Sequence, residues 1–249
     1  MGDDMRGISI NDPNCIQTVE ELEAFIEEVG FVPLFANEIE GFSVEEHTAP
    51  DYWWTDVYEK DPWRWREIVA REKRIAYGKF FDKKAGFISL KWLPYFVNAR
   101  RNGYDFDARW EDGFANRREK VIMDVYISSD EDGDSEFPER DILSTELKKQ
   151  CGFKKGGYKN YPGIVTALQM QTYLVISDFV RRKNKSGVDY GMPVSVLNTP
   201  EAVWGYKEVT KMYGDSPEQS RQKIIDHVRE LYIDADDKTI EKLIGKQTE

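Results

Sequence analysis

The sequence predicts an α+β fold that is mostly helical. Several segments open with a helix-capping pattern and continue with apolar residues three and four positions apart, which is the spacing of one helix face. Only two pairs of segments show instead the short apolar runs and polar turns of β-hairpins. With 249 residues, the chain can bury a sizeable core in one large domain or two small ones.

Residues 1–115 are predicted to form an aromatic-rich N-terminal α/β region. The range Thr18–Glu21 is a capping box that opens a first helix, and Gly30 ends that helix. Asp61 is placed to cap a second helix, which has Pro62 at its first position.

The same region contains a predicted hairpin and a third helix. A polar turn at 82–85 joins apolar runs at 75–81 and 86–89. Ser89 then caps a helix, and we expect residues 104–116 to form a loop because they mix polar and aromatic side chains without helical spacing.

Residues 116–198 follow the element order of a winged helix-turn-helix domain: a helix, a short extended piece, two more helices and a two-stranded ribbon. Helices are expected at 116–127, 145–151 and 161–172, and strands at 174–179 and 193–197. A basic turn, 181–187, forms the tip of the ribbon. The acidic stretch 128–139 is predicted to be a solvated loop, because it lacks the alternating ligands and distal Glu of a calcium site.

Residues 199–249 are predicted to form a helical C-terminal tail packed on the rest of the chain. Thr199–Glu201 opens one helix, and the capping box Ser216–Gln219 opens another. A last short helix is expected near 237–244.

The charge of the chain is strongly segregated. The net charge of −11 and the pI near 4.9 exclude a generically basic nucleic-acid coat protein. Residues 1–50 alone carry −11, residues 141–200 carry +5, and the remainder carries −5. The only strongly basic segment therefore coincides with the winged-helix pattern.

This coincidence predicts contact with DNA. In a winged helix the second helix of the turn lies in the major groove, and the ribbon runs along the backbone. We expect phosphate contacts from the residues ahead of that helix and at the ribbon tip, namely Lys154, Lys155, Lys159, Arg181, Arg182, Lys183 and Lys185. Gln169 and Gln171 are candidates for hydrogen bonds to base edges, although they lie late in the helix and on different sides of it.

Aromatic residues are concentrated between positions 53 and 110, which hold six of the seven tryptophans and several interleaved arginines. One interpretation is a stacking pocket for a base or another flat ligand. The other, which we favour, is an aromatic core whose arginines bridge its edge. The candidate pocket comprises Trp63, Trp65, Arg66, Trp92, Asp105, Asp107 and Arg109. Its two aspartates could orient a water molecule, but a structural clamp between Asp and Arg109 is the simpler interpretation.

Other chemistry has little support. The spacing of Cys15, Cys151, His47 and His227 does not match a metal-ligand pattern, so we predict no metal site. The sequence also contains no glycine-rich phosphate-binding loop, so we predict no cofactor. No run is long and apolar enough to span a membrane, and the N-terminus lacks a secretory signal. We therefore expect a cytoplasmic protein of bacterial type with reduced cysteines.

Two segments resemble the AlkZ/YcaQ family of winged-helix DNA glycosylases, and in particular the sequences described as AlkZ-related. Lys83–Phe96 resembles the family segment with an aromatic–His–x–Ala core followed by Pro and an apolar pair, and Leu143–Leu197 resembles its helix-turn-helix and wing. Glu20–Phe35 is a looser third match. The resemblance implies a winged-helix fold, contact with DNA and relatives that remove alkylated or cross-linked bases.

The chain departs from that family at its catalytic positions. The family places a Gln-x-Gln or Gln-x-Asp motif near the N-terminus to position the attacking water, whereas Gly30–Phe35 here has neither Gln nor Asp. Lys83 or Lys84 stands where the family has His. The Gln-x-Gln at 169–171 lies inside a predicted helix, and we interpret it as a chance match.

We therefore predict a winged-helix nucleic-acid-binding protein, related to DNA glycosylases but without the catalytic residues of that family. One alternative is a divergent base-excision glycosylase, which would be a hydrolase. Another is a protein-interaction module that uses the acidic N-terminal segment. The sequence leaves the oligomeric state open.

Overall fold

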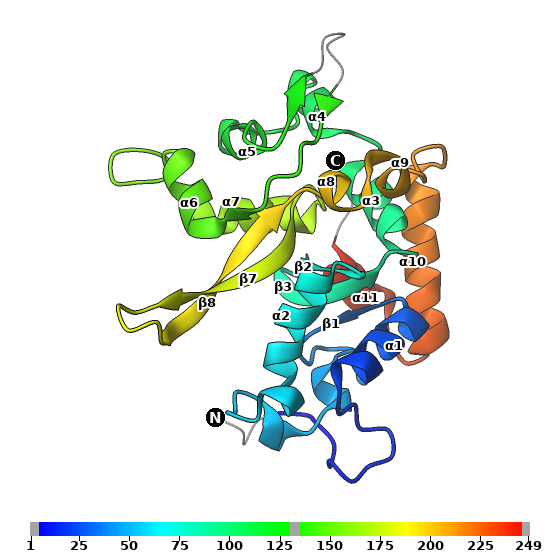
Figure 1. The fold of residues 1–249 in the computed structure, drawn as a ribbon. Coiled ribbons are helices and arrows are strands. Elements are labelled where there is room, and N and C mark those ends of the chain that lie inside the picture. The colour runs from blue at the N-terminus through cyan, green and yellow to red at the C-terminus, as the bar shows by residue number, and fades with distance from the viewer. Residues whose placement is uncertain (1–4, 130–134, 246–249) are drawn as a thin grey trace.

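Helices and antiparallel strands are arranged in an α+β fold (Figure 1). Its buried apolar residues form two hydrophobic cores. The computed structural model describes residues 5–129 and 135–245. The larger core surrounds a sheet from the N-terminal half and also takes in the C-terminal helices. The smaller core is built entirely from residues between Phe106 and Leu197. Helix predominates over strand, as the sequence predicts.

The larger core is built on a three-stranded antiparallel sheet in the order β1-β3-β2. Its strands are β1 (Phe31–Pro33), β2 (Ile75–Phe81) and β3 (Lys84–Ser89). Asp82 and Lys83 form the tight turn between β2 and β3, with φ of 44° and 65°. The predicted hairpin is thereby confirmed, with its second strand beginning two residues earlier than expected.

Helices cover this sheet. They are α1 (Val19–Val29), α2 (Pro62–Glu72) and α3 (Leu93–Arg101), with short 3-10 turns at Glu45–His47, Pro50–Tyr52 and Tyr58–Lys60. Two predicted caps are present: Thr18 accepts from the backbone N–H of Glu21, and Asp61 from that of Trp63. The expected cap by Ser89 was wrong, because α3 begins at Leu93 and its N-cap residue is Trp92. Gly30 ends α1 with φ of 83°, and a Cβ there would lie only 2.3 Å from the Trp92 ring.

The C-terminal segment is helical, as predicted. It comprises α8 (Pro200–Trp204), α9 (Tyr206–Val209), α10 (Pro217–Leu231) and α11 (Asp237–Ile244). Helix α10 packs along α3, and α11 contacts β2, where the Asp82 N–H donates to the Leu243 carbonyl at 3.1 Å. The apolar faces of both helices belong to the larger core.

The smaller core lies between two groups of elements. The first group comprises α4 (Phe106–Glu111), α5 (Arg117–Met123), β4 (Ser128–Ser129) and β5 (Ser135–Glu136). The second comprises β6 (Ile142–Leu143), α6 (Ser144–Gln150), α7 (Tyr161–Met170), β7 (Val175–Lys183) and β8 (Asp189–Asn198). The last three strands form an antiparallel sheet in the order β6-β8-β7.

Two segments expected to be loops contain regular secondary structure. The expected loop at 104–116 was wrong in part, because residues 106–111 form α4, whose Phe106 is buried against Tyr173. The centre of the acidic stretch predicted at 128–139, residues 130–134, lies outside the described residues, and its flanks pair as β4 and β5.

Arg101 joins the two cores. Its buried guanidinium forms an ion pair with Glu201 of α8 and donates to the Thr172 carbonyl at 2.7 Å. It also lies 4.5 Å from the centre of the Tyr173 ring. Within 5–129 and 135–245, no helix is long and apolar enough to cross a membrane.

Candidate nucleic-acid interface

In the connector between α6 and α7, residues 151–160, the lysines point outward and Phe153 points into the core. Phe153 is buried, with ring centres 5.5 Å from Tyr158 and 5.2 Å from Tyr161. Backbone bonds from the N–H groups of Lys154 and Tyr158 to the Gly152 carbonyl, at 3.0 and 3.1 Å, fold the loop back on itself. The connector is therefore an ordered platform for its charged side chains.

These lysines surround a hollow of about 560 Å³ at the start of α7. It is lined by Lys148, Lys154, Lys155 and Lys159, together with Phe153, Gly156, Tyr158, Asn160, Tyr161 and Pro162. None of the described residues that line it is Asp or Glu. In a chain of net charge −11, such a group of unopposed cations is a local reversal of the overall field.

Helix α7 divides its residues between the core and an outer face. Ile164, Val165 and Leu168 are buried in the smaller core. The outer face consists of small or uncharged residues, namely Pro162, Gly163, Thr166, Ala167 and Met170, which are exposed or half-buried.

Gln169 in α7 and Gln171 directly after it both make contacts within the protein. Gln169 is only 2% exposed, and its Oε1 accepts from the backbone N–H of Lys79 at 2.9 Å. The Gln171 amide is half-buried and donates to Glu119 at 3.4 Å. The suggestion that Gln169 contacts base edges is therefore wrong, because its side chain instead serves a strand of the other core.

A second hollow, of about 640 Å³, adjoins the first and runs between α7 and β2. The two share Asn160 and Pro162. The second is lined by the outer face of α7, by Lys79, Lys83 and Arg100, and by Gln171 and Gly245. Again, none of its described lining residues is acidic. Burial lowers the pKa of Arg100 to about 9, and its guanidinium donates to the Phe80 and Ile244 carbonyls.

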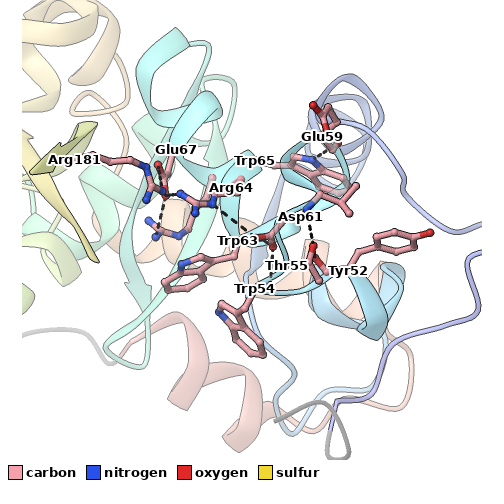
Figure 2. A network of polar contacts seen from close by, with 12 residues as sticks. Tyr52, Trp54, Thr55, Glu59, Asp61, Trp63, Arg64, Trp65, Glu67 and Arg181 are labelled. Atoms are coloured by element: carbon pink, nitrogen blue, oxygen red, sulfur yellow. Dashed lines mark hydrogen bonds and ion pairs between the residues drawn. The ribbon is translucent and has the colours of Figure 1, made fainter. Parts of the chain in front are cut away.

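The ribbon of β7 and β8 separates its basic residues by direction. Arg182, Lys183 and Lys185 are exposed toward the tip. Arg181 turns instead toward α2, where it donates to both carboxylate oxygens of Glu67 at 2.9 and 3.1 Å (Figure 2). The guanidinium of Arg181 is thus already engaged within the protein.

Three residues of the candidate aromatic pocket, Trp63, Trp65 and Arg66, lie on α2. Figure 2 shows the two tryptophans. Trp65 is buried, and its indole N–H donates to the Glu59 carbonyl at 2.9 Å. The Arg66 guanidinium lies between the rings of Trp63 and Phe179, at 3.7 and 4.3 Å from their centres. This is the bridging arrangement expected of an aromatic core.

The other four residues of that candidate pocket lie in different contact networks. Trp92 stacks on His227 with ring centres 4.2 Å apart. Asp105 accepts from the hydroxyl groups of Tyr206 and Tyr213, at 2.6 and 3.2 Å. Asp107 accepts from Ser135, and Arg109 pairs with Glu119 at 3.6 Å. The structure therefore does not gather the seven side chains around one space.

Asp61 organises the surface beside α2. It is almost fully buried, and its Oδ1 accepts from the N–H groups of Trp54 and Trp63 at 3.1 and 2.9 Å (Figure 2). Burial raises the pKa of this carboxyl group. Trp54 is held with a φ of 58° and is 47% exposed. Among residues 5–129 and 135–245, no cluster of three or more His, Cys, Asp or Glu could hold a metal ion.

Two lysines that line the α7–β2 hollow are absent from the candidates expected from sequence. Lys79 is the single exposed residue in the otherwise buried β2, and Lys83 lies in the turn that follows. The sequence signal for Lys79 was a single charged residue in an otherwise apolar strand. Because Lys79 lies about ninety positions from α7 in the sequence, the sequence alone does not indicate that the two are neighbours in space.

Comparison with known proteins agrees with the resemblance seen in the sequence. Neither the curated proteins nor the solved structures contain a significant match to the chain. A family model described as AlkZ related matches residues 16–245, which include both cores and both lysine-lined hollows. The chain therefore belongs to the AlkZ-related family.

Proposed function

We propose that the protein binds nucleic acid, with double-stranded DNA as its partner, through a winged helix-turn-helix domain at 116–198. Support comes from the order α5, β6, α6, α7, β7 and β8, with the short β4 and β5 between α5 and β6, and from the pairing of β6 with β8 beside β7. In this arrangement α7 is the second helix of the turn, and the β7–β8 ribbon is the wing.

The observation that carries the proposal is the lysine-lined hollow at the start of α7. Four lysines meet there without an acidic neighbour among the described lining residues. Backbone phosphates are the ligands that such a surface attracts, because their neutralisation releases counterions. The connector and the ribbon tip project from the same side of the molecule in Figure 1, so both can approach one ligand.

The proposed contacts are Lys154, Lys155 and Lys159 on the connector, and Arg182, Lys183 and Lys185 on the wing. Arg181 is left out because Glu67 already binds its guanidinium. The acidic N-terminal segment has a partly internal use: Glu45 accepts from the backbone N–H groups of Arg6 and Ala36, both at 3.0 Å. This use favours DNA binding over a role of that segment in binding a basic partner.

We further propose that binding proceeds without the base-excision chemistry of the glycosylases related to this family. The stretch that takes the place of the Gln-containing motif contains β1, whose residues Phe31–Pro33 are all buried and apolar. Such side chains cannot hold and orient a water molecule for attack on a glycosidic carbon.

Fluorescence anisotropy with a labelled duplex tests the proposal. The variant Lys154→Ala/Lys155→Ala/Lys159→Ala is compared with the wild type and with Lys91→Ala/Lys207→Ala/Lys238→Ala, which removes equal charge from exposed lysines elsewhere. We expect the connector variant to bind more weakly and to lower the slope of log K against log salt by about 0.9 per lost phosphate contact. Absence of wild-type binding at low salt would contradict the proposal.

A further inference from the structure

The groove between α7 and β2, defined by the second hollow, extends the cationic surface beyond the connector. It continues from Asn160 and Pro162, which it shares with the first hollow, to Lys79 and Lys83 on the hairpin. A surface continuous over this length can follow more than one phosphate of a strand.

The two walls of this groove are fixed to each other. The Gln169 side chain accepts from the Lys79 N–H at 2.9 Å, and the Met170 sulfur accepts from the Lys83 N–H at 3.2 Å. Both bonds use the backbone of the hairpin, so the side chains of Lys79 and Lys83 are left exposed. The groove is therefore formed before any ligand arrives.

The outer face of α7 has no side chain that could form a bidentate hydrogen-bonded pair with a base edge. Direct readout uses long polar groups such as Arg, Lys, Asn and Gln on the helix face that enters the groove. Here that face presents Pro162, Gly163, Thr166, Ala167 and Met170. Gln169 is buried and accepts from the Lys79 N–H, whereas Gln171, directly after the helix, lies at the end of the groove and its amide N–H donates to Glu119 at 3.4 Å.

We propose that the α7–β2 groove holds the phosphodiester backbone of the bound nucleic acid and that the contact along α7 is independent of base sequence. This inference rests on the proposed function and extends it to Lys79 and Lys83. Small residues on α7 allow the backbone to lie close to the helix, while the two lysines on the opposite wall neutralise its charge.

The first test removes the two charges without disturbing the turn. Lys79→Gln is combined with Lys83→Asn, because Asn tolerates the φ of 65° at position 83. The matched control is Lys91→Gln/Lys207→Asn, and thermal unfolding confirms that each variant folds. In anisotropy titrations we expect the groove variant to weaken duplex binding and to lower the salt slope by about one per lost phosphate contact.

The outcomes separate this inference from the function on which it rests. If the groove variant matches the control while the connector variant binds weakly, the groove is not a backbone site, although the proposed function stands. If the wild type does not bind, or all variants bind equally, the proposed function itself fails.

Two further arms test the ligand. Two duplexes of equal length and unrelated sequence should bind alike, whereas even one base-specific contact would separate them by about fivefold or more and overturn sequence independence. Deoxyadenosine monophosphate, added at constant ionic strength, should not displace the duplex. Displacement that is lost in the groove variant would assign the groove to free nucleotides instead.

Discussion

The Arg181 guanidinium and the Glu67 carboxylate form a two-bond ion pair, at 2.9 and 3.1 Å, between β7 and α2 (Figure 2). Two more arginines, Arg64 and Arg66, lie 3.7 Å from the same carboxylate. Their positive charge accumulates around one partly buried acid. One of the seven cations expected from sequence to contact DNA is thus used to hold the β7–β8 ribbon against α2.

The neighbouring arginines of β7, Arg181 and Arg182, are therefore expected to behave differently on substitution. Arg181→Ala should lower the free energy of unfolding by about 1–3 kcal/mol, because a partly buried carboxylate loses two charge-assisted bonds. Arg182→Ala should leave stability unchanged and weaken DNA binding. Urea unfolding and anisotropy on both variants check this. Weaker binding with unchanged stability in Arg181→Ala would show that this side chain contacts DNA after all.

The buried pair of Arg101 and Glu201 should be sensitive to the loss of either partner. Glu201→Gln is expected to cost about 3–5 kcal/mol of stability, because it leaves the Arg101 charge buried without its counterion. The double variant Arg101→Leu/Glu201→Leu should cost less than the sum of the single changes. Urea midpoints provide the measurement, and additive effects would show that the two side chains are energetically independent.

Asp141 makes stability depend on pH. Burial alone would raise the pKa of this carboxyl group, but hydrogen bonds from Ser177, Asn198 and Lys73 outweigh burial and lower the pKa. A lowered folded-state pKa stabilises the protein above the unfolded value, near pH 4, and this stabilisation is lost as pH falls through the folded value. Asp141→Asn should therefore be less stable at pH 7 and lose less stability on acidification. Urea unfolding at pH 7 and below pH 4 checks this. An equal difference in unfolding free energy between wild type and variant at the two pH values would contradict it.

Gly30 and Gly103 offer a matched comparison of backbone strain. Both have positive φ, 83° and 75°, but a Cβ at Gly30 would lie 2.3 Å from the Trp92 ring, whereas a Cβ at Gly103 meets nothing within 4 Å. Gly103→Ala should cost about 1 kcal/mol, from the left-handed conformation alone. Gly30→Ala should cost clearly more, because the ring must also move. If both variants lower the thermal midpoint equally, the Trp92 ring can move away from a Cβ at position 30 without cost.

The proposed lack of base excision is also measurable. A duplex containing an alkylated purine should be bound by the wild type, yet release no free base and form no abasic site over prolonged incubation. Release of base would restore the glycosylase alternative, and the catalytic groups would then have to lie outside β1.

Much of the fold follows from local sequence, because caps and turns are short-range devices. Thr18, Asp61 and the turn at Asp82 each act within a few residues, and the structure confirms all three. Helix α4 was missed because its six residues carry no capping hydrogen bond and owe their position to Phe106 in the core. In α4, tertiary packing stabilises a helix that the local sequence does not specify.

The site was harder to predict, because its contacts link distant parts of the chain. Charge counting located the connector lysines, whose surroundings are mostly local. It could not assign a direction to Arg181 and Arg182, which are adjacent in a strand that has an irregular register between Val180 and Arg182. Nor could it place Lys79 opposite α7, since that neighbour depends on how the two cores meet.

The bond from Lys79 to Gln169 has a consequence for the thermodynamics of association. The ladder between β2 and β3 shifts register between Gly78 and Phe81, and a glutamine from the other core supplies the missing acceptor for Lys79. The helix and the hairpin are thereby locked at a fixed separation, so a ligand need not order them. Binding should then show little of the heat-capacity change and entropy loss that accompany coupled folding.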